Sequence, residues 1–353
     1  MDTSFNWTLA AMLAGGVLIA SWSGTRTVIE WLTRKNVLDH PNDRSNHSEP
    51  TPRGGGLAIL AAVLPALIVV HFSIPDPSNA IITLVVLTAL LGLVSWIDDT
   101  KNLNPVIRLV AQISAVLLAL LLSSISPIPA LLFLPSLLQV TIIVLGWVWF
   151  INLFNFMDGI DGIAAVETIS ISAGVVLIGT LQGEPDAALI LPGLILIAGS
   201  LGFLIWNVTP AKIFLGDVGS VTLGFLLGWL LLTVAAKGFF VAAIILPLFF
   251  IVDATWTLLR RITQREKIWD AHSQHFYQRA VKRGLSHGRV TFAVFVLNAL
   301  LITLAIASIK QPLPAFFLAL FFVVGFIVYL KKVSLTKGRP LFRKPPVDRD
   351  PGP

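Results

Sequence analysis

Long apolar runs separated by short polar segments dominate this chain. A bilayer-spanning helix takes about 20 residues, and runs of that order occupy residues 6–24, 55–74, 80–97, 106–125, 130–151, 163–181, 187–206, 220–236, 238–257, 290–309 and 312–330. The pattern therefore predicts an all-α, polytopic membrane protein with about eleven spans. Ten spans are the alternative, because the short break "AAKGFF" near Lys237 allows two readings.

These spans and their loops form one predicted transmembrane domain over residues 1–330. The remaining segment, 331–353, is rich in proline and charge, and we expect it to be a disordered tail. The first span lacks a basic leader and a small-residue cleavage site, so it is predicted to be a retained helix.

The distribution of Lys and Arg predicts the orientation, because cytoplasmic loops carry the positive excess. With the N-terminus in the periplasm, and with Arg108 counted with its adjacent inner loop, 23 of the 25 basic residues lie inside, and only Lys237 and Lys310 lie outside. The C-terminus is then cytoplasmic. The net charge of +6 is explained by this bias, so we predict no nucleic-acid partner. The chain has no cysteine, which excludes disulfides and thiolate metal sites.

Almost every residue able to do chemistry lies in the predicted inner segments, 25–54, 98–105, 152–162, 207–219 and 258–289. The outer connections are short and turn-like. A functional site is therefore expected to face the cytoplasm.

Three inner loops are acidic. "WIDDTKNLNP" places Asp98 and Asp99 side by side, where two carboxylates repel unless a cation or proton separates them; a solvated helix end is the alternative. "IFLGDVGS" places Asp217 between glycines, and a simple turn with a Ser220 cap is the alternative. A hard divalent cation gives these loops a common reason, since Mg²⁺ typically takes one or two carboxylates and leaves other positions to water and phosphates.

The third acidic loop, "NLFNFMDGIDG", carries Asn152, Asn155, Asp158 and Asp161. Spacings of three bring the amides and Asp158 together on a helix surface before the glycines break it. An ordinary inner loop would be expected to carry Lys or Arg, and this one has neither. The pattern favours an oxygen-ligand or substrate site over a plain polar loop.

Basic and glycine-rich segments predict anion binding. "DHPNDRSNHSEPTPRGGG" combines Arg44 and Arg53 with a glycine triplet that opens the second span, which favours a phosphate seat at a helix N-terminus; a flexible membrane entry is the alternative. The loop from 260 to 291 mixes eight Lys or Arg with His272 and His275, which can grip a diphosphate. The alternative is a basic segment that lies on anionic lipid.

Two further acids, Glu167 and Asp253, lie in or near predicted spans. Acids at membrane depth are functional candidates by default. A hydrogen bond between helices is the equally weighted alternative.

Taken together, five motifs between about 38 and 290 resemble the polyprenyl-phosphate N-acetylhexosamine-1-phosphate transferase family, which includes the peptidoglycan lipid I synthase and O-antigen-initiating enzymes. They are "DHPNDRSNHSEPTPRGGG", the Asp pair, "NLFNFMDGIDG", "IFLGDVGS" and the histidine loop. The resemblance implies transfer of a sugar 1-phosphate from a UDP-N-acetylhexosamine to undecaprenyl phosphate, with release of UMP. It also implies Mg²⁺, with Mn²⁺ as an alternative, and a multi-pass location among the lipids of the bacterial cytoplasmic (inner) membrane. A homodimer is left open as a partner.

The resemblance also implies roles for individual residues. Asp217 matches the Mg²⁺ ligand, and Phe214 matches the aromatic that stacks on uracil. Asp98 and Asp99 match the essential acidic pair, with Asp98 a second candidate metal ligand. The expected substrate-binding residues are Arg44, Arg53, Asn152, Asn155, Asp158, Asp161, Phe214, His272 and His275.

One departure from the family pattern narrows the predicted subgroup. Lipid I synthases carry adjacent histidines in the last loop, whereas "AHSQHFYQRAV" spaces them as HxxH. This resembles the subgroup that starts O-antigen or capsule repeats and leaves GlcNAc, N-acetylfucosamine and N-acetylquinovosamine open as sugars.

The lipid phosphate is mostly dianionic at neutral pH, because its second pKa is near 6. We therefore favour direct attack over a covalent enzyme intermediate. A lipid-linked sugar flippase or proton-coupled transporter is the alternative function. It predicts acids near mid-span and repeated broken helices, whereas here the acids cluster at span ends and no repeat is evident.

Overall fold

A computed structural model describes residues 5–41, 49–73, 79–123, 127–181, 183–267 and 272–336. Helices make up nearly all of its regular structure. The long ones are α1 (Trp7–Arg34), α2 (Gly56–Ser73), α3 (Ala80–Lys101), α4 (Pro105–Leu122), α5 (Ser136–Phe156), α6 (Ile163–Thr180), α7 (Ala187–Asn207), α8 (Asp217–Ala236), α12 (His287–Ala307) and α13 (Pro312–Thr336). The shorter elements are η1 (Pro129–Leu131), α9 (Phe240–Ile245), α10 (Leu248–Thr263), α11 (Phe276–Lys282) and two-residue strands β1 (Leu38–Asp39) and β2 (Thr51–Pro52).

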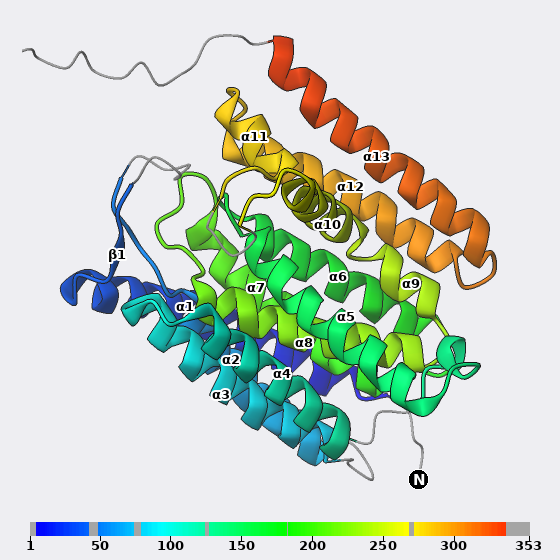
Figure 1. The fold of residues 1–353 in the computed structure, drawn as a ribbon. Helices are drawn as coiled ribbons and strands as arrows, with labels where there is room; N and C mark the ends of the chain where they lie inside the picture. The colour runs from blue at the N-terminus through cyan, green and yellow to red at the C-terminus, as the bar shows by residue number, and fades with distance from the viewer. Residues whose placement is uncertain are drawn as a thin grey trace, which may run out of the picture.

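Ten of the helices in the described residues are long and apolar enough to cross a membrane. This confirms the predicted all-α polytopic class. In Figure 1 the long helices run side by side in one bundle, with α1–α4 on one flank and α12–α13 on the other. The most buried span is α8, in which 89% of the most apolar 18-residue stretch is buried. In α4 and α13 only 22% of that stretch is buried, so these helices lie at the periphery of the bundle.

The predicted span 238–257 is wrong as a single helix. The chain forms α9, breaks at Leu246 and Pro247, and continues as α10. Proline has no N–H to continue the helix and clashes with the preceding turn. Figure 1 shows α10 end-on, across the direction of α5 and α6. Helices α8 and α12 both begin beside one large cavity at the same end of the bundle. Because α8 runs away from that end, α9 and α10 together return the chain to it.

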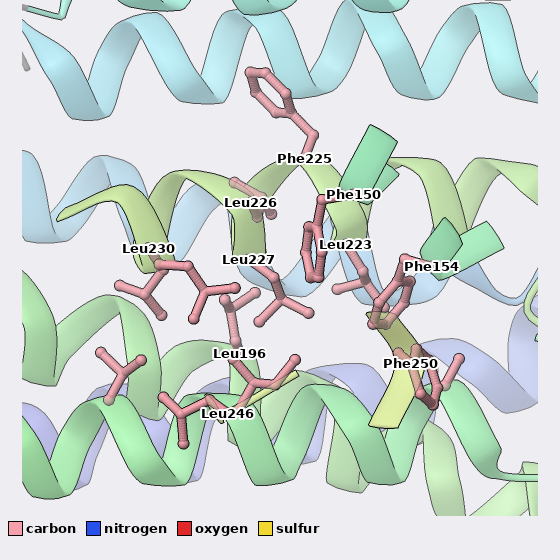
Figure 2. Close-up of a cluster of buried hydrophobic side chains, with 14 of the residues drawn as sticks. Phe150, Phe154, Leu196, Leu223, Phe225, Leu226, Leu227, Leu230, Leu246 and Phe250 are labelled. Atoms are coloured by element: carbon pink, nitrogen blue, oxygen red, sulfur yellow. The ribbon is translucent and has the colours of Figure 1, made fainter. Parts of the chain in front are cut away.

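A hydrophobic core of Phe and Leu side chains joins α5, α7, α8, the α9–α10 break and the start of α10 (Figure 2). Trp147 stacks on Phe225 at a centroid distance of 4.9 Å, and its indole N–H donates to the Phe225 carbonyl at 3.0 Å. A side chain at Gly228 would meet the indole at 2.3 Å, so this glycine is needed for close contact. In a membrane such packing, rather than water exclusion, holds helices together. The core fixes α5, which leads into the motif "NLFNFMDGIDG", and α8, which begins at Asp217.

Candidate functional site

A cavity of about 1330 Å³ lies where the predicted inner loops meet at one end of the bundle. All five predicted segments contribute side chains to its wall, among them Asp39, Asp98, Asp158, Asp217 and His272. The loops that the sequence placed on one membrane face therefore converge on one site. Arg44 lies outside the described residues.

The acidic centre of the cavity joins the start of α8 to the end of α3. Asp217 opens α8 after the left-handed Gly216, and Asp98 lies in the last turn of α3. The two carboxyl groups approach within contact of each other. Arg108, from the first turns of α4, places one guanidinium nitrogen 2.9 Å from Asp98 Oδ2 and 3.5 Å from Asp217 Oδ2. A like-charge pair this close calls for a cation or a proton between or beside its members.

Asp99 has a different environment from its neighbour. Its side chain is fully buried and accepts hydrogen bonds from the backbone N–H groups of Asp217 and Val218, both at 3.0 Å. It also receives Arg53 Nε at 2.9 Å. The structure thus places Asp99 beneath the cavity, where it caps α8 and anchors Arg53, and only Asp98 of the pair lines the cavity wall.

Arg53 lines the cavity and bridges two acids. Its Nη2 donates to Asp217 Oδ1 at 2.6 Å, and its Nε faces Asp99. Burial alone would lower the pKa of Arg53, but the charges of Asp217, Asp99 and Asp39 raise it. The guanidinium therefore stays charged at the polar end of the cavity.

The glycine triplet after Arg53 does not offer its N–H groups to an anion, which corrects the predicted phosphate seat. Gly54 and Gly55 donate to the Phe214 carbonyl at 3.1 and 2.9 Å, and Gly56 donates to the Leu215 carbonyl at 2.9 Å. A Cβ on Gly56 would lie 2.2 Å from Gly219. The triplet instead serves close packing of the tips of α2 and α8. The Phe214 side chain lines the cavity beside this junction.

The two amides of "NLFNFMDGIDG" lie in the last turns of α5, as their spacing predicted. Asn152 donates to Gln112 Oε1 on α4 at 2.6 Å, and Asn155 donates to Ser220 Oγ on α8 at 2.8 Å. Both side chains line the cavity. They therefore tie α5 to the neighbouring helices while they face the site.

The two carboxylates of the same motif lie in opposite electrostatic settings. Burial is the main cause that raises the pKa of Asp158 well above its ordinary value, opposed by Arg53 and assisted by nearby acids. For Asp161 burial would also raise the pKa, but His287, the Ala211 N–H and Thr209 lower it overall. His287 Nδ1 lies 2.9 Å from Asp161 Oδ1.

The histidine loop closes the other side of the cavity. His272 lines the wall, and burial together with His275 and Arg261 lowers its pKa to about 4. His275 is only 2% exposed, and its Nδ1 lies 3.2 Å from Asp253 Oδ1 on α10. Asp253 is thus part of the site's support, which answers one of the two open questions about acids at membrane depth.

Glu167 has the other role that the sequence left open. It is buried between α6 and α12, where Asn298 Nδ2 donates to its Oε2 at 2.7 Å. It does not line the cavity. This acid provides a hydrogen bond between helices.

The cavity also has an apolar end. Its lining there comes from α4, α5 and α10, with Leu109, Leu145, Val148, Trp149 and Leu258. Arg108 and Asn152 separate these side chains from the acidic centre along their own helices. One continuous cavity therefore offers a charged region and a region suited to an isoprenoid or acyl chain.

Among the described residues, no three or more His, Asp or Glu side chains are grouped to hold a metal ion. Mg²⁺ needs only one or two protein carboxylates when water and phosphate supply the rest. The contacting Asp98 and Asp217 carboxyl groups, which face the cavity, fit that requirement.

Sequence reasoning missed two site residues. Arg108 is a lone cation inside a predicted apolar span, and this position was its only signal. His287 follows a Ser in "GLSHGR" at the start of α12, where Ser286 caps the helix. Both reach the site only because α4 and α12 pack beside loops that are distant in sequence.

Comparison with known proteins gives a consistent set of relatives. The glycosyl transferase family 4 description matches residues 81–235. The chain is 27% identical over 316 residues to a probable undecaprenyl-phosphate N-acetylglucosaminyl 1-phosphate transferase of Bacillus subtilis (strain 168), which covers 86% of this chain and 85% of the relative.

Two other relatives are similarly distant. A decaprenyl-phosphate N-acetylglucosaminephosphotransferase of Mycolicibacterium smegmatis is 28% identical over 74% of this chain and 73% of its own length. A phospho-N-acetylmuramoyl-pentapeptide-transferase of Saccharopolyspora erythraea is 29% identical over 71% of this chain and 81% of its own length.

Proposed function

The chain belongs to the polyprenyl-phosphate N-acetylhexosamine-1-phosphate transferases of glycosyl transferase family 4, and on that premise we propose the full reaction. It transfers an N-acetylhexosamine 1-phosphate from a UDP-sugar to undecaprenyl phosphate and releases UMP. The observation that carries this proposal is the single cavity with an acidic, arginine-bridged end and an apolar end. A water-soluble nucleotide sugar and a membrane lipid need such a shared site.

The acceptor's chain is assigned to the apolar end, along Leu109, Val148 and Leu258. Its phosphate then reaches Arg108; within the part of the chain that the structure describes, Nη1 makes the contacts to Asp98 and Asp217, and the side chain stays 39% exposed at the cavity. An arginine fork with free donors is suited to phosphate.

The donor is assigned to the opposite wall. Phe214 stacks on uracil, and Asn155, Asp158 and Asp161 form the nucleotide side of the pocket. His272 and His275 face the sugar diphosphate. The low pKa of His272, about 4, keeps this ring neutral at physiological pH, so it contacts the donor as a hydrogen-bonding group and not as a cation.

Asp217 and Asp98 would hold Mg²⁺, which neutralises charge on the diphosphate when bound. Arg53 and Arg108 hold the two carboxylates in place from either side. Phosphoryl transfer asks the protein chiefly for positioning and charge neutralisation. The lipid phosphate oxygen attacks the sugar-linked phosphorus, the P–O bond to UMP breaks, and Asp98 orients the attacking phosphate.

In the proposed orientation, with the N-terminus in the periplasm, this cavity lies at the cytoplasmic surface of the inner membrane. The HxxH spacing supports a role in the first step of O-antigen or another surface polysaccharide, with GlcNAc, N-acetylfucosamine or N-acetylquinovosamine as the sugar.

Purified protein with undecaprenyl phosphate, Mg²⁺ and a panel of UDP-N-acetylhexosamines should release UMP from at least one donor. Asp217→Asn should abolish that release while the protein still elutes as a folded species. No release from any donor would overturn the proposal. A radiolabelled sugar phosphate on the enzyme after incubation without lipid would replace direct attack by a covalent route.

A further inference from the structure

A buried carboxylate from the broken ninth span supports the histidine loop. Asp253 on α10 is fully buried and accepts hydrogen bonds from the backbone N–H of Phe276 at 3.1 Å and of Tyr277 at 3.3 Å. Thr257, one turn along α10, donates to it at 3.2 Å. These contacts hold the start of α11 against α10.

The same carboxylate contacts the imidazole of His275. Asp253 Oδ1 lies 3.2 Å from Nδ1, while His275 Nε2 is buried and has no hydrogen-bond partner among the described residues. His275 also lines the cavity. A polar nitrogen buried without a partner is costly unless a ligand completes it.

Two tautomers compete at this ring. The backbone N–H of Gln278 also points at the His275 side chain, which favours an unprotonated Nδ1. The carboxylate favours a proton on Nδ1, and hydrogen bonds to an ionised acceptor are roughly twice as strong as neutral ones. The Asp253 contact therefore decides the tautomer.

We propose that Asp253 is a positioning residue for the transfer reaction: it holds the proton on Nδ1 of His275 and aims Nε2 at the sugar diphosphate of the donor. The proposal rests on the proposed function only for the identity of the donor. A carboxylate behind a functional histidine commonly fixes its ring orientation and tautomer.

The geometry also assigns α10 a dual task. Its Leu258 lines the apolar end of the cavity, and its Asp253 supports the histidine wall. A second set of hydrogen bonds attaches the loop to the end of the same helix, where Glu266 accepts from Arg261 at 2.8 Å and from Gln274 at 2.9 Å. These hydrogen bonds should hold the loop in place when Asp253 is changed.

The first test measures which ring nitrogen of His275 carries the proton. Wild-type protein labelled with ¹⁵N-histidine, with the His275 signals assigned by His275→Gln, should show Nδ1 protonated in the absence of substrate. Asp253→Asn should change that pattern. A wild-type ring protonated only at Nε2 would overturn the proposal, whether or not the protein proves to be a transferase.

The second test is a double-mutant cycle on UMP release. Asp253→Asn should lower kcat/KM for the donor by about 10–100-fold, the range seen for lost supporting contacts. In the His275→Gln background the same change should add little, because its target is gone. Equal losses in both backgrounds would show that Asp253 acts on the fold alone.

Glu167→Gln is the matched control. It also converts a buried carboxylate to an amide, but it lies outside the cavity lining and contacts Asn298. It should leave donor kcat/KM unchanged. A loss equal to that of Asp253→Asn would show that any buried acid in the bundle has this effect and would overturn the assignment.

Discussion

Asp98 and Asp99 look equivalent in the sequence, yet their replacement by alanine should have different main effects. Asp99→Ala should chiefly lower the stability of the fold, and Asp98→Ala should chiefly lower activity. In Asp99→Ala the backbone N–H groups of Asp217 and Val218 lose their acceptor, and Arg53 loses one partner. Each buried N–H left unsatisfied costs about 1–3 kcal/mol. The expected loss is therefore about 2–6 kcal/mol, a large share of the roughly 5–15 kcal/mol that stabilises an ordinary domain.

Asp98→Ala removes a single backbone contact, from the Leu103 N–H at 2.7 Å, and frees Arg108, which solvent reaches. Its cost in stability should stay near about 1–3 kcal/mol, whereas UMP release should fall to background. Asp99→Asn, which keeps one acceptor oxygen, should fall between the wild type and Asp99→Ala in stability.

The assay is thermal unfolding in detergent, followed by intrinsic tryptophan fluorescence at one scan rate, with UMP release measured on the same preparations. Asp99→Ala should melt several degrees below Asp98→Ala. The reasoning is refuted if Asp98→Ala is the less stable protein, or if Asp99→Ala melts with the wild type.

Three further outcomes follow from the structure. Gly56→Ala should lower the melting temperature, because its Cβ would lie 2.2 Å from a backbone atom of α8, whereas Gly146→Ala, which has no atom of the described residues within 4 Å, should not. Equal melting temperatures would contradict the close packing of the tips of α2 and α8. Because the pKa of His272 is about 4 when folded, against roughly 6.5 when unfolded, the unfolded chain binds its proton first, so stability should fall as pH drops from about 6.5 to about 4. His272→Gln should reduce that slope, and an unchanged slope in pH-dependent melting would contradict the assignment. Phe214→Ala should raise the donor KM by about 5–150-fold, since stacking on a base is worth about 1–3 kcal/mol, and should leave the KM for the lipid unchanged. A change in the lipid KM instead would contradict the assignment of uracil to Phe214.

The helices and the shared face of the loops could be predicted because hydropathy and charge bias act locally along the chain. The break at Pro247 could not, since a proline inside an apolar run is compatible with either a kinked span or two helices. The end of α1 was also missed: it continues to Arg34 instead of stopping at 24, because helical propensity persists after the apolar run ends.

The site was predictable only in part, for a different reason. Acidic motifs are contiguous in sequence, so Asp158, Asp161 and Asp217 stood out without any knowledge of packing. Their partners do not share this property. Arg108 and the role of the glycine triplet depend on which helix tips meet, and no local pattern records that α2, α4 and α8 converge.

Positive charge reaches the acidic centre from other parts of the fold, but it does not balance the acids completely. Arg53 and Arg108 face three carboxyl groups, those of Asp98, Asp99 and Asp217, so the centre carries an excess of negative charge whenever all three are ionised. A nucleotide diphosphate and a lipid phosphate add more. Like charges at these distances repel strongly where water is limited, so two anionic substrates can meet here only with an additional cation. This imbalance, more than any single ligand, is the physical reason to expect Mg²⁺ between Asp98 and Asp217, and it predicts that donor affinity measured without a divalent cation is far weaker than with one.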